Sequence, residues 1–479
     1  MTDRKKRKMK VLLVTPGEPS SPVVPDLGAG YLASALRKAG HEVSFLDGLK
    51  VKLTAGRIGR HCRGFGASAV GLKIFSSFLR QSAETAKIVR SLLPNVLLFA
   101  GGPHPSCDPG GILASIPELD FAVAGEGEET LPAAIEAFPD LTGLRKIPNL
   151  VFRSGNGIIL TPGKTVADLD SLSWPAWDLI DPRSYPPAPQ GLFLKSHPAG
   201  RMIATRGCPN DCGFCSVSLL NGRRVRTRDP LDIREEIRFL HDRMGVREIH
   251  FSDDNFTASR KFALEACAGI AGLPFRIHWA VPQGIRLDTL DRELLAEMKR
   301  SGCYGVGVGL ESGSPAILKK MGKKESLGMM REKVGLLSRA GIRTLGYFIV
   351  GYPEETEEDV KRTIEFSRSL PLDSAAFSIF QPFAGTRVHD ELKKSGIPGG
   401  PEKFGGDYDF AERAVPPWTP GRLVLLKRKA LIGFYSRFSA LFRFVKGINL
   451  AVQIPWLASR IVKTFCRKRP SPSPRDSFS

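Results

Sequence analysis

The feature that most constrains the fold is a long alternation of short apolar runs with helix-length segments over residues 10–380. Short apolar runs without polar alternation are typical of strands that are buried on both faces of a parallel sheet. Helical segments of about 10–15 residues between such runs indicate β/α units. The pattern therefore predicts an α/β protein, and 479 residues allow two or three domains.

Residues 10–140 predict an open, doubly wound, Rossmann-like sheet. In such a sheet a ligand binds beyond the carboxyl ends of the strands. The expected strands are Val11–Val14, Val43–Leu46, Ala69–Leu72, Val96–Phe99 and Phe121–Ala124.

Residues 201–385 predict six further units of strand and helix. Six units make a partial barrel, open along one side, with its site at the carboxyl ends of the strands. The proline-rich residues 141–200 are expected to form a structured connector that contains a hairpin near Ser154–Gly157. The expected barrel strands are Arg201–Thr205, Arg247–Phe251, Phe275–Ala280, Gly305–Leu310, Thr344–Val350 and Ala375–Phe380.

Three cysteines follow the first strand of this second domain. Cys208, Cys212 and Cys215 have the spacing C-x3-C-x2-C, which supplies one thiolate fewer than a cubane iron–sulfur cluster needs. A catalytic metal keeps one position open for a ligand, whereas a structural site closes its coordination sphere. The spacing favours a catalytic cluster, and a zinc site completed by a distant His or Cys is the alternative.

The cysteine loop, with Phe214 before the last cysteine, resembles the signature of the radical S-adenosylmethionine (radical SAM) superfamily. In that family SAM chelates the fourth iron through its amino and carboxylate groups. The resemblance implies a [4Fe–4S] cluster on the three cysteines and places Phe214 beside the adenine.

Later strand ends carry polar groups that are consistent with each part of SAM. The end of the second strand offers acceptors for the amino group, and the end of the third offers a guanidinium for the carboxylate. The end of the fourth offers acceptors for the ribose. The end of the fifth carries a glycine motif that resembles the adenine side of the superfamily's site. The residues expected in these roles are Asp253, Asp254 and Asn255, then Arg286, then Glu311 and Ser312, then Gly351 and Glu354.

The first domain resembles the cobalamin-binding module that precedes many radical SAM barrels. Hydroxyl groups there can bond the nucleotide tail, and glycines let the backbone approach it. A Rossmann-like fold without a cofactor is the alternative. The residues expected to bind cobalamin are Ser76, Ser77, Gly101, Gly102, His104, Gly125, Glu126 and Gly127.

The cobalt ligand of related domains is missing from this sequence. Residues 15–27 lack the D-x-H-x-x-G pattern that places a histidine under cobalt in those domains. His104 lies in a different loop, so we do not expect it to bind cobalt.

Positive charge gathers at both ends of the chain. Of a formal net charge of +20, residues 421–479 contribute 13 Lys/Arg against one acid, and residues 1–10 contribute six against one. Residues 1–9 are expected to be a basic tail, residues 386–466 a basic helical extension, and residues 467–479 a disordered tail. The extension resembles the C-terminal helix of the cobalamin-dependent branch. It is expected either to lie on an anionic membrane or to pack on the barrel.

Cysteine usage and hydropathy bear on the compartment. The eight cysteines are scattered, unlike a secreted disulfide framework. No signal-peptide core and no apolar run long enough to span a bilayer are recognised. A cytoplasmic protein is therefore expected, and peripheral contact with the inner membrane surface is the alternative to a purely cytosolic location. Neither the cysteine-bearing domain nor the RNA-binding barrel of the RNA methylthiotransferases is recognised, so no nucleic-acid partner is expected.

The whole pattern predicts a cobalamin-dependent radical SAM enzyme. We expect it to methylate an unactivated carbon of an apolar metabolite or lipid, with electrons from a donor such as flavodoxin or ferredoxin. One alternative is oxidative ring formation like that of the anaerobic magnesium-protoporphyrin ester cyclases. Another is a corrinoid-binding regulator with an inactive barrel. No residue in the sequence identifies the substrate or a catalytic acid or base.

Overall fold

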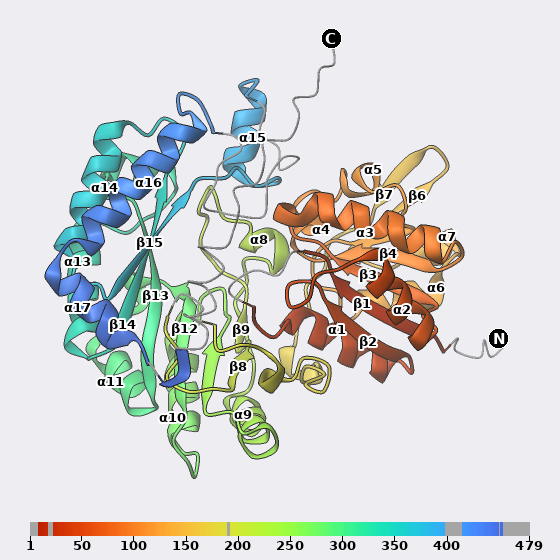
Figure 1. Cartoon of the computed structure of the whole chain (residues 1–479), viewed down its shortest axis with the longest axis horizontal. Coiled ribbons are helices and arrows are strands. Elements are labelled where there is room, and N and C mark those ends of the chain that lie inside the picture. The colour runs from red at the N-terminus through yellow and green to blue at the C-terminus, as the bar shows by residue number, and fades with distance from the viewer. Residues whose placement is uncertain (1–7, 18–22, 189–191, 398–413, 450, 454–479) are drawn as a thin grey trace.

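The computed structural model shows two α/β domains side by side (Figure 1). The structure describes residues 8–17, 23–188, 192–397, 414–449 and 451–453. Most of the expected basic N-terminal tail, residues 398–413, 450 and 454–466 of the expected extension, and the expected disordered tail 467–479 lie outside these ranges.

In the described residues the first domain contains one seven-stranded sheet of order β2-β1-β3-β4-β5-β6-β7. The first five strands are parallel, and the last two run antiparallel. The expected hairpin is present as β6 and β7, and it extends the sheet past residue 140. The strands are β1 (Lys10–Thr15), β2 (Glu42–Asp47), β3 (Ala69–Lys73), β4 (Leu97–Gly101), β5 (Phe121–Val123), β6 (Leu150–Ser154) and β7 (Gly157–Leu160).

Helices cover both faces of this sheet, which confirms the doubly wound architecture. Successive side chains of a strand point to opposite faces, so Leu12 and Val14 pack in one core while Val11 and Leu13 pack in the other. The helices are α1 (Leu27–Lys38), α2 (Ala55–Phe65), α3 (Leu79–Leu92), α4 (Pro103–Cys107), α5 (Ile112–Ser115), α6 (Thr130–Ala137) and α7 (Leu141–Leu144).

The second domain is the expected partial barrel. In the part of the chain that the structure describes, six parallel strands have the order β15-β14-β13-β12-β11-β8, so β8 and β15 are the two open edges. The strands are β8 (Ala199–Met202), β11 (Glu248–Phe251), β12 (His278–Ile285), β13 (Cys303–Glu311), β14 (Arg343–Val350) and β15 (Ser374–Ile379).

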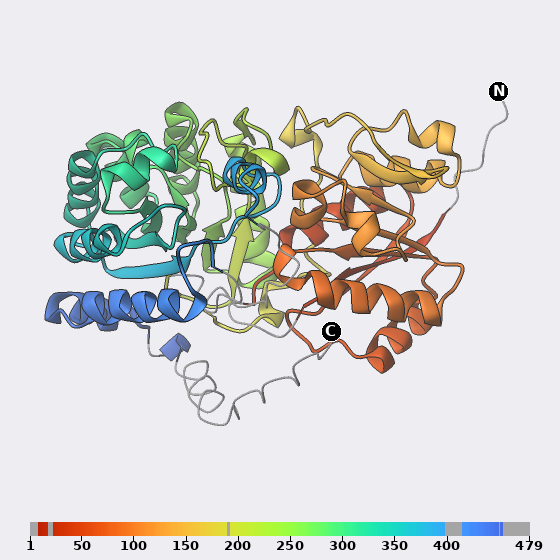
Figure 2. The same ribbon diagram turned by 90° about the horizontal axis from the view of Figure 1, so that it is seen from above.

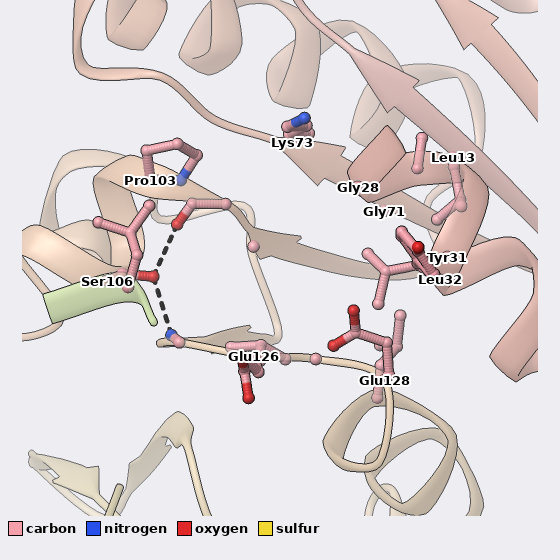
Figure 3. A pocket seen from close by; sticks show the side chains of 18 of the residues that line it. Leu13, Gly28, Tyr31, Leu32, Gly71, Lys73, Pro103, Ser106, Glu126 and Glu128 are labelled. Carbon is pink, nitrogen blue, oxygen red and sulfur yellow. Dashed lines mark hydrogen bonds between the residues drawn. The ribbon is translucent and has the colours of Figure 1, made fainter. Parts of the chain in front are cut away.

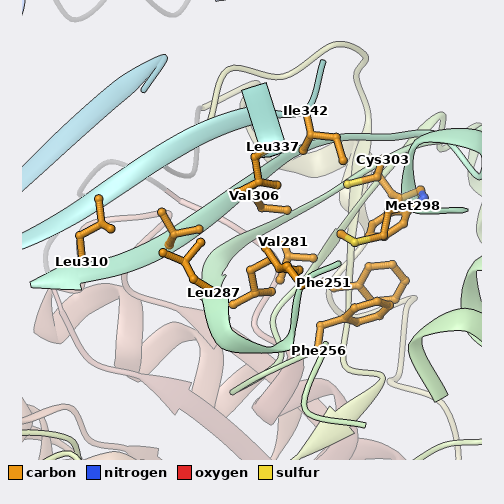
Figure 4. Close-up of a cluster of buried hydrophobic side chains, with 14 of the residues drawn as sticks. Phe251, Phe256, Val281, Leu287, Met298, Cys303, Val306, Leu310, Leu337 and Ile342 are labelled. Carbon is orange, nitrogen blue, oxygen red and sulfur yellow. The ribbon is translucent and has the colours of Figure 1, made fainter. Parts of the chain in front are cut away.

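A ring of helices surrounds these strands, and large apolar side chains such as Phe251 and Phe256 fill the space between strands and helices (Figure 4). This core holds the carboxyl ends of the strands in place. The helices are α8 (Val217–Leu220), α9 (Pro230–Met244), α10 (Arg260–Ala271), α11 (Arg292–Arg300), α12 (Pro315–Lys320), α13 (Leu327–Arg339) and α14 (Glu357–Ser369).

The first barrel strand is shorter than predicted. Strand β8 ends at Met202, and Thr205–Arg206 (β9) instead pairs antiparallel with Arg226–Thr227 (β10). The carboxylate of Asp253 accepts hydrogen bonds from the backbone N–H groups of Ala204 and Thr205. Because these two N–H groups bond the Asp253 side chain, they are not available to a neighbouring strand. The chain therefore leaves the parallel sheet before the cysteine loop.

The C-terminal extension packs on the barrel. Within the described part of the extension expected over residues 386–466, the helices are α15 (Arg387–Lys394), α16 (Pro420–Tyr435) and α17 (Phe438–Gly447). Helix α16 lies along the outside of the edge strand β15 (Figure 2) and buries Leu423, Leu426, Ala430 and Phe434 there. Within the described residues, no helix is both long enough and apolar enough to cross a membrane.

Candidate active site between the two domains

A cavity of about 250 Å³ lies between the carboxyl ends of β1, β3, β4 and β5 and the start of the barrel (Figure 3). Apolar side chains such as Leu32, Phe45 and Phe99 form much of its wall. Its other side is formed by Arg206, Asn221 and Asp254 near the cysteine loop. The cavity therefore reaches the entry of the cysteine loop. Its lining includes none of the three cysteines and, of the residues expected to bind SAM, only Asp254.

Five of the eight residues expected to bind cobalamin line this cavity, and three do not. Ser76, Ser77 and His104 are absent from its wall. The hydroxyl of Ser76 lies 3.0 Å from Nδ1 of His104, and both side chains are buried behind the wall. The five that line the cavity are Gly101, Gly102, Gly125, Glu126 and Gly127.

Ser106 holds the two glycine loops together, although the sequence analysis did not identify it. Its hydroxyl donates to the carbonyl oxygen of Gly102 at 2.9 Å and accepts from the backbone N–H of Gly125 at 2.8 Å (Figure 3). A serine at the fourth position of the short helix after β4 was the only sign of this role in the sequence.

The cysteine loop is fixed at both ends by Asp254. This carboxylate accepts the backbone N–H of Gly207 at 2.8 Å and the side-chain N–H of Asn221 at 2.8 Å. Gly207 has φ of 91°, and a Cβ there would lie 2.2 Å from the carbonyl oxygen of Arg224. Only glycine fits this turn, which explains the glycine before Cys208.

A buried ion-pair quartet connects the two domains beside the cavity. Arg206 contacts Glu128 at 2.6 Å and Glu126 at 3.3 Å, and Arg226 contacts Glu126 at 2.7 Å. All four side chains are between 3% and 8% exposed. Burial alone would raise the pKa of Glu128, but the charge and hydrogen bond of Arg206 hold this pKa below its ordinary value. The charges of the two arginines and the two glutamates cancel. The carboxylate of Glu126, which belongs to the first domain, is therefore paired with arginines of the barrel domain.

Comparison with known proteins identifies both domains. Residues 17–135 match the B12 binding domain family, and residues 202–367 match the Radical SAM superfamily. An uncharacterised methyltransferase of Pyrococcus horikoshii is 33% identical over 387 residues, which is 79% of this chain and 82% of that protein. The chain belongs to the cobalamin-dependent radical SAM enzymes. Its cofactors are a [4Fe–4S] cluster, SAM and cobalamin.

Other relatives of this radical SAM enzyme are named for different activities. The cytidylyl-2-hydroxyethylphosphonate methyltransferase of Streptomyces wedmorensis is 27% identical over 422 residues, covering 78% of each chain. The anaerobic magnesium-protoporphyrin IX monomethyl ester cyclase of Cereibacter sphaeroides is 28% identical over 376 residues, covering 77% of this chain and 60% of the cyclase.

Among solved structures, the radical SAM methyltransferase TsrM of Kitasatospora setae with cobalamin and a [4Fe–4S] cluster bound has a similar fold. Its TM-score is 0.68 at 20% identity, with 89% of this chain and 82% of that chain covered.

We propose that the three cysteines of the radical SAM enzyme hold its [4Fe–4S] cluster. Cys208, Cys212 and Cys215 are free thiols of intermediate exposure on one loop. No three His, Cys, Asp or Glu side chains in the described residues converge on a single metal ion. A cubane does not need such convergence, because each of its irons takes its own thiolate. Burial raises the pKa of the Cys215 thiol to about 12, and in this proposal the bound iron stabilises the thiolate.

The acidic loop after β11 supports the cysteine loop of the enzyme. Asp253 and Asp254 both accept N–H groups from the segment that leads into it, and Asn255 is buried and accepts from Thr257 at 3.4 Å. Burial raises the pKa of Asp253 to about 7 and also raises that of Asp254. Of the three, Asp254 lines the cavity, and we propose it as the acceptor for the amino group of SAM.

Charged residues from neighbouring strand ends meet near Cys212. Lys323 lies 3.2 Å from both Glu311 and Glu325, and Arg286 lies 3.8 Å from Glu325. Arg286 and Lys323 both favour the Cys212 thiolate electrostatically, although burial raises its pKa overall. Lys323 was not expected from the sequence, because it lies in a turn after α12 and not at a strand end.

Asp288 already occupies the Arg286 guanidinium at 2.8 Å. Lys323 is more fully committed, because its ammonium contacts Glu311, Glu325 and the carbonyl oxygen of Gly309, so we propose Arg286 as the contact for the carboxylate of SAM. Ser312 is fully buried and bonds Thr363 at 3.1 Å, so the structure does not present its hydroxyl to the cavity.

The expected adenine side divides into buried and exposed parts. Phe214 packs with Tyr352, which follows Gly351. Glu354 has φ of 62° and pairs with Lys320 on the surface, whereas the next residue, Glu355, is buried and accepts the Gly351 N–H at 2.5 Å. Burial raises the pKa of Glu355 to about 7. Glu355 therefore fixes the glycine turn.

We predict that bound cobalamin has no histidine from this protein on cobalt. His104 faces Ser76, its Nε2 is buried without a partner among the described residues, and burial lowers its pKa. Electron paramagnetic resonance of the Co(II) state should show no superhyperfine splitting from a protein nitrogen, and His104→Ala should leave the spectrum unchanged. Splitting that disappears in His104→Ala would contradict the prediction.

Proposed function

We propose that this enzyme transfers a methyl group to an unactivated carbon of a small apolar metabolite or lipid. The shared cavity carries the proposal, because the glycine loops proposed for cobalamin and the base of the cysteine loop form opposite walls of one space. When bound, the cluster and SAM supply a radical that removes a hydrogen atom from the substrate, and methylcobalamin supplies the methyl group.

Residues of this chain support that chemistry by position and by exclusion of water. The quartet of Arg206, Arg226, Glu126 and Glu128 ties the glycine loop to the strand that enters the cysteine loop. Fixed loops hold the reacting groups close together and correctly oriented, and this accounts for a large part of the rate enhancement by enzymes. The apolar wall removes water that would otherwise quench a reactive intermediate.

The test combines reconstitution with product analysis. Anaerobic enzyme loaded with iron, sulfide and cobalamin and reduced with dithionite is given SAM with a deuterated methyl group and extracts of a strain that lacks the gene. Methyl transfer predicts a product heavier by one labelled methyl group in place of hydrogen, and the native compound should be missing from the deletion strain. A product lighter by two hydrogens, without label, would show ring formation instead. Failure to form 5′-deoxyadenosine would contradict both reactions.

We also propose that a small acidic protein such as flavodoxin or ferredoxin supplies the electron. Arg223, Lys324 and Arg387 surround Asp211 in the cysteine loop, and together they lower the pKa of its carboxylate, Arg223 most of all. Their charge exceeds that of Asp211, so this rim is cationic where the loop reaches the surface. Complementary charge speeds protein association and makes it sensitive to salt.

Removing two of these cations should slow reduction by the protein donor. In Arg223→Gln/Lys324→Gln we expect 5′-deoxyadenosine formation with reduced flavodoxin to fall about tenfold at low salt. The rate with dithionite should not change. Lys261→Glu, an exposed change on α10, is the matched control. An equal loss with both reductants would show damage to the site and would contradict a docking role.

We further propose that the enzyme works in the cytoplasm and contacts the inner membrane surface peripherally. The charge of residues 421–479 supports this contact, because a basic surface is attracted to anionic lipid. The same contact is the reason for proposing an apolar substrate.

A further inference from the structure

Helix α17 exposes a continuous apolar stripe. Phe438, Leu441, Phe442 and Val445 follow the spacing i, i+3, i+4, i+7, which places them on one face of the helix. They are 82%, 48%, 58% and 56% exposed. The rings of Phe438 and Phe442 are stacked with centroids 6.3 Å apart. A soluble helix normally turns such a face inward, so this face is available for a partner.

The opposite face of α17 is already fixed to the barrel, so the stripe cannot rotate inward. Phe444 packs edge-on against Phe193 and Tyr435, at centroid distances of 5.0 and 5.3 Å. Ala440 is buried, and the guanidinium of Arg343 donates to the carbonyl oxygen of Gly447 at 2.9 Å. The helix therefore has one packed side and one uncovered apolar side.

Cationic side chains lie beside the C-terminal half of the stripe. Arg343, Arg443 and Lys446 line one hollow beside Phe442, together with the single acid Asp373. Arg343 and Lys446 also line an adjoining hollow with Lys195 and His278, which contains no acidic residue. Burial and the neighbouring Arg343 lower the pKa of Lys195, so this end of the barrel repels further positive charge. An anion would relieve that repulsion.

We infer that the outer face of α17 docks on a bilayer that contains anionic phospholipid. The four apolar side chains would enter the boundary of the acyl chains, while Arg443, Lys446 and the two basic hollows meet the phosphate groups. Charge complementarity favours this partner, because the surface around the stripe is cationic on the side where a headgroup layer would lie. This inference rests on the membrane contact proposed above and assigns it to named residues.

The docking face lies at the amino ends of β14 and β15, because its hollows include Ile342, Arg343 and Asp373 at the starts of those strands. The cavity lies at the carboxyl ends of the N-terminal strands and the start of the barrel. The membrane would therefore hold the enzyme from the end opposite the barrel's carboxyl face. In this arrangement the contact tethers the enzyme and does not open the cavity directly into the bilayer.

Flotation of the full-length protein with vesicles tests the assignment. Vesicles of phosphatidylcholine alone are compared with vesicles of phosphatidylcholine and phosphatidylglycerol, at low and high salt. The wild type should float with the anionic vesicles at low salt. Leu441→Gln/Phe442→Gln should reduce the bound fraction about tenfold or more. Arg443→Gln/Lys446→Gln should remove the preference for phosphatidylglycerol. Leu231→Gln, which changes a 62% exposed leucine on α9, is the matched control and should bind like the wild type.

Each other outcome overturns the assignment in a distinguishable way. If no version floats, the proposed membrane contact and the role of α17 both fail. If the wild type and Leu441→Gln/Phe442→Gln float equally, the contact holds through another segment and α17 is not the docking face. If that variant melts well below Leu231→Gln, the stripe is covered within the chain itself. SAM cleavage should persist in every variant, since none of these residues touches the cofactor cavity.

Discussion

Cys212→Ala is expected to abolish SAM cleavage and to leave the protein without an intact [4Fe–4S] cluster. In the proposed assignment each cysteine of the loop supplies the only thiolate for its iron, and the loop contains no other cysteine that could substitute. Cys208 and Cys215 should behave in the same way. Iron and sulfide content, the visible absorption of the cluster and the yield of 5′-deoxyadenosine from dithionite-reduced enzyme measure the effect.

A buried cysteine of the same domain serves as the control for this change. Cys267 lies in α10 and is fully buried among apolar side chains. Cys267→Ala should keep the cluster and SAM cleavage, because it removes only a small packed side chain. Full cluster content with normal cleavage in Cys212→Ala would show that the cysteine assignment is wrong.

Glu126→Ala is expected to lower the free energy of unfolding by about 3–5 kcal/mol, the usual cost of removing one partner from a buried ion pair. The change leaves Arg226 and Arg206 with only Glu128 between them, in a region that is at most 8% exposed. Since Glu126 lies in a glycine loop that lines the cavity, cobalamin binding should weaken as well. Urea denaturation and equilibrium dialysis with cobalamin measure the two effects.

The neighbouring ion pair provides a matched control. Glu129 contacts Lys164 at 2.9 Å, but these side chains are 51% and 58% exposed. An exposed pair contributes about 0–1 kcal/mol, so Glu129→Ala should have little effect on stability or cobalamin affinity. Equal stability of the Glu126 and Glu129 variants would show that the quartet does not hold the domains together.

Local sequence pattern accounts for most of the secondary structure. The start of helix α14 (Glu357–Ser369) can be recognised in the sequence, because Thr356 and Asp359 form a capping box there. The strand expected at Ala69–Leu72 differs by one residue from β3. Helix α2 was not expected, because three glycines interrupt its apolar pattern; Thr54 and Gly66 cap its two ends.

The sequence predicted which site residues follow which strand and how they are spaced, but it did not predict their contacts. The sequence indicated that Asp254 and Cys212 lie at the same end of the barrel, since carboxyl ends of parallel strands share one edge. It could not show that Asp254 already binds Gly207 and Asn221, because that contact depends on how β8 ends.

By itself, the sequence determined the two α/β domains, the cysteine loop and the glycine loops, because each depends on residues close together in the chain. Only the tertiary structure decided which of these residues share the cavity. It separated His104 and Ser76 from that cavity and joined Glu126 to Arg226, 100 positions away. It also buried one face of α16 and left one apolar face of α17 exposed. The physical reason is that burial and long-range charge pairing depend on packing between elements, which residue spacing along one element does not encode.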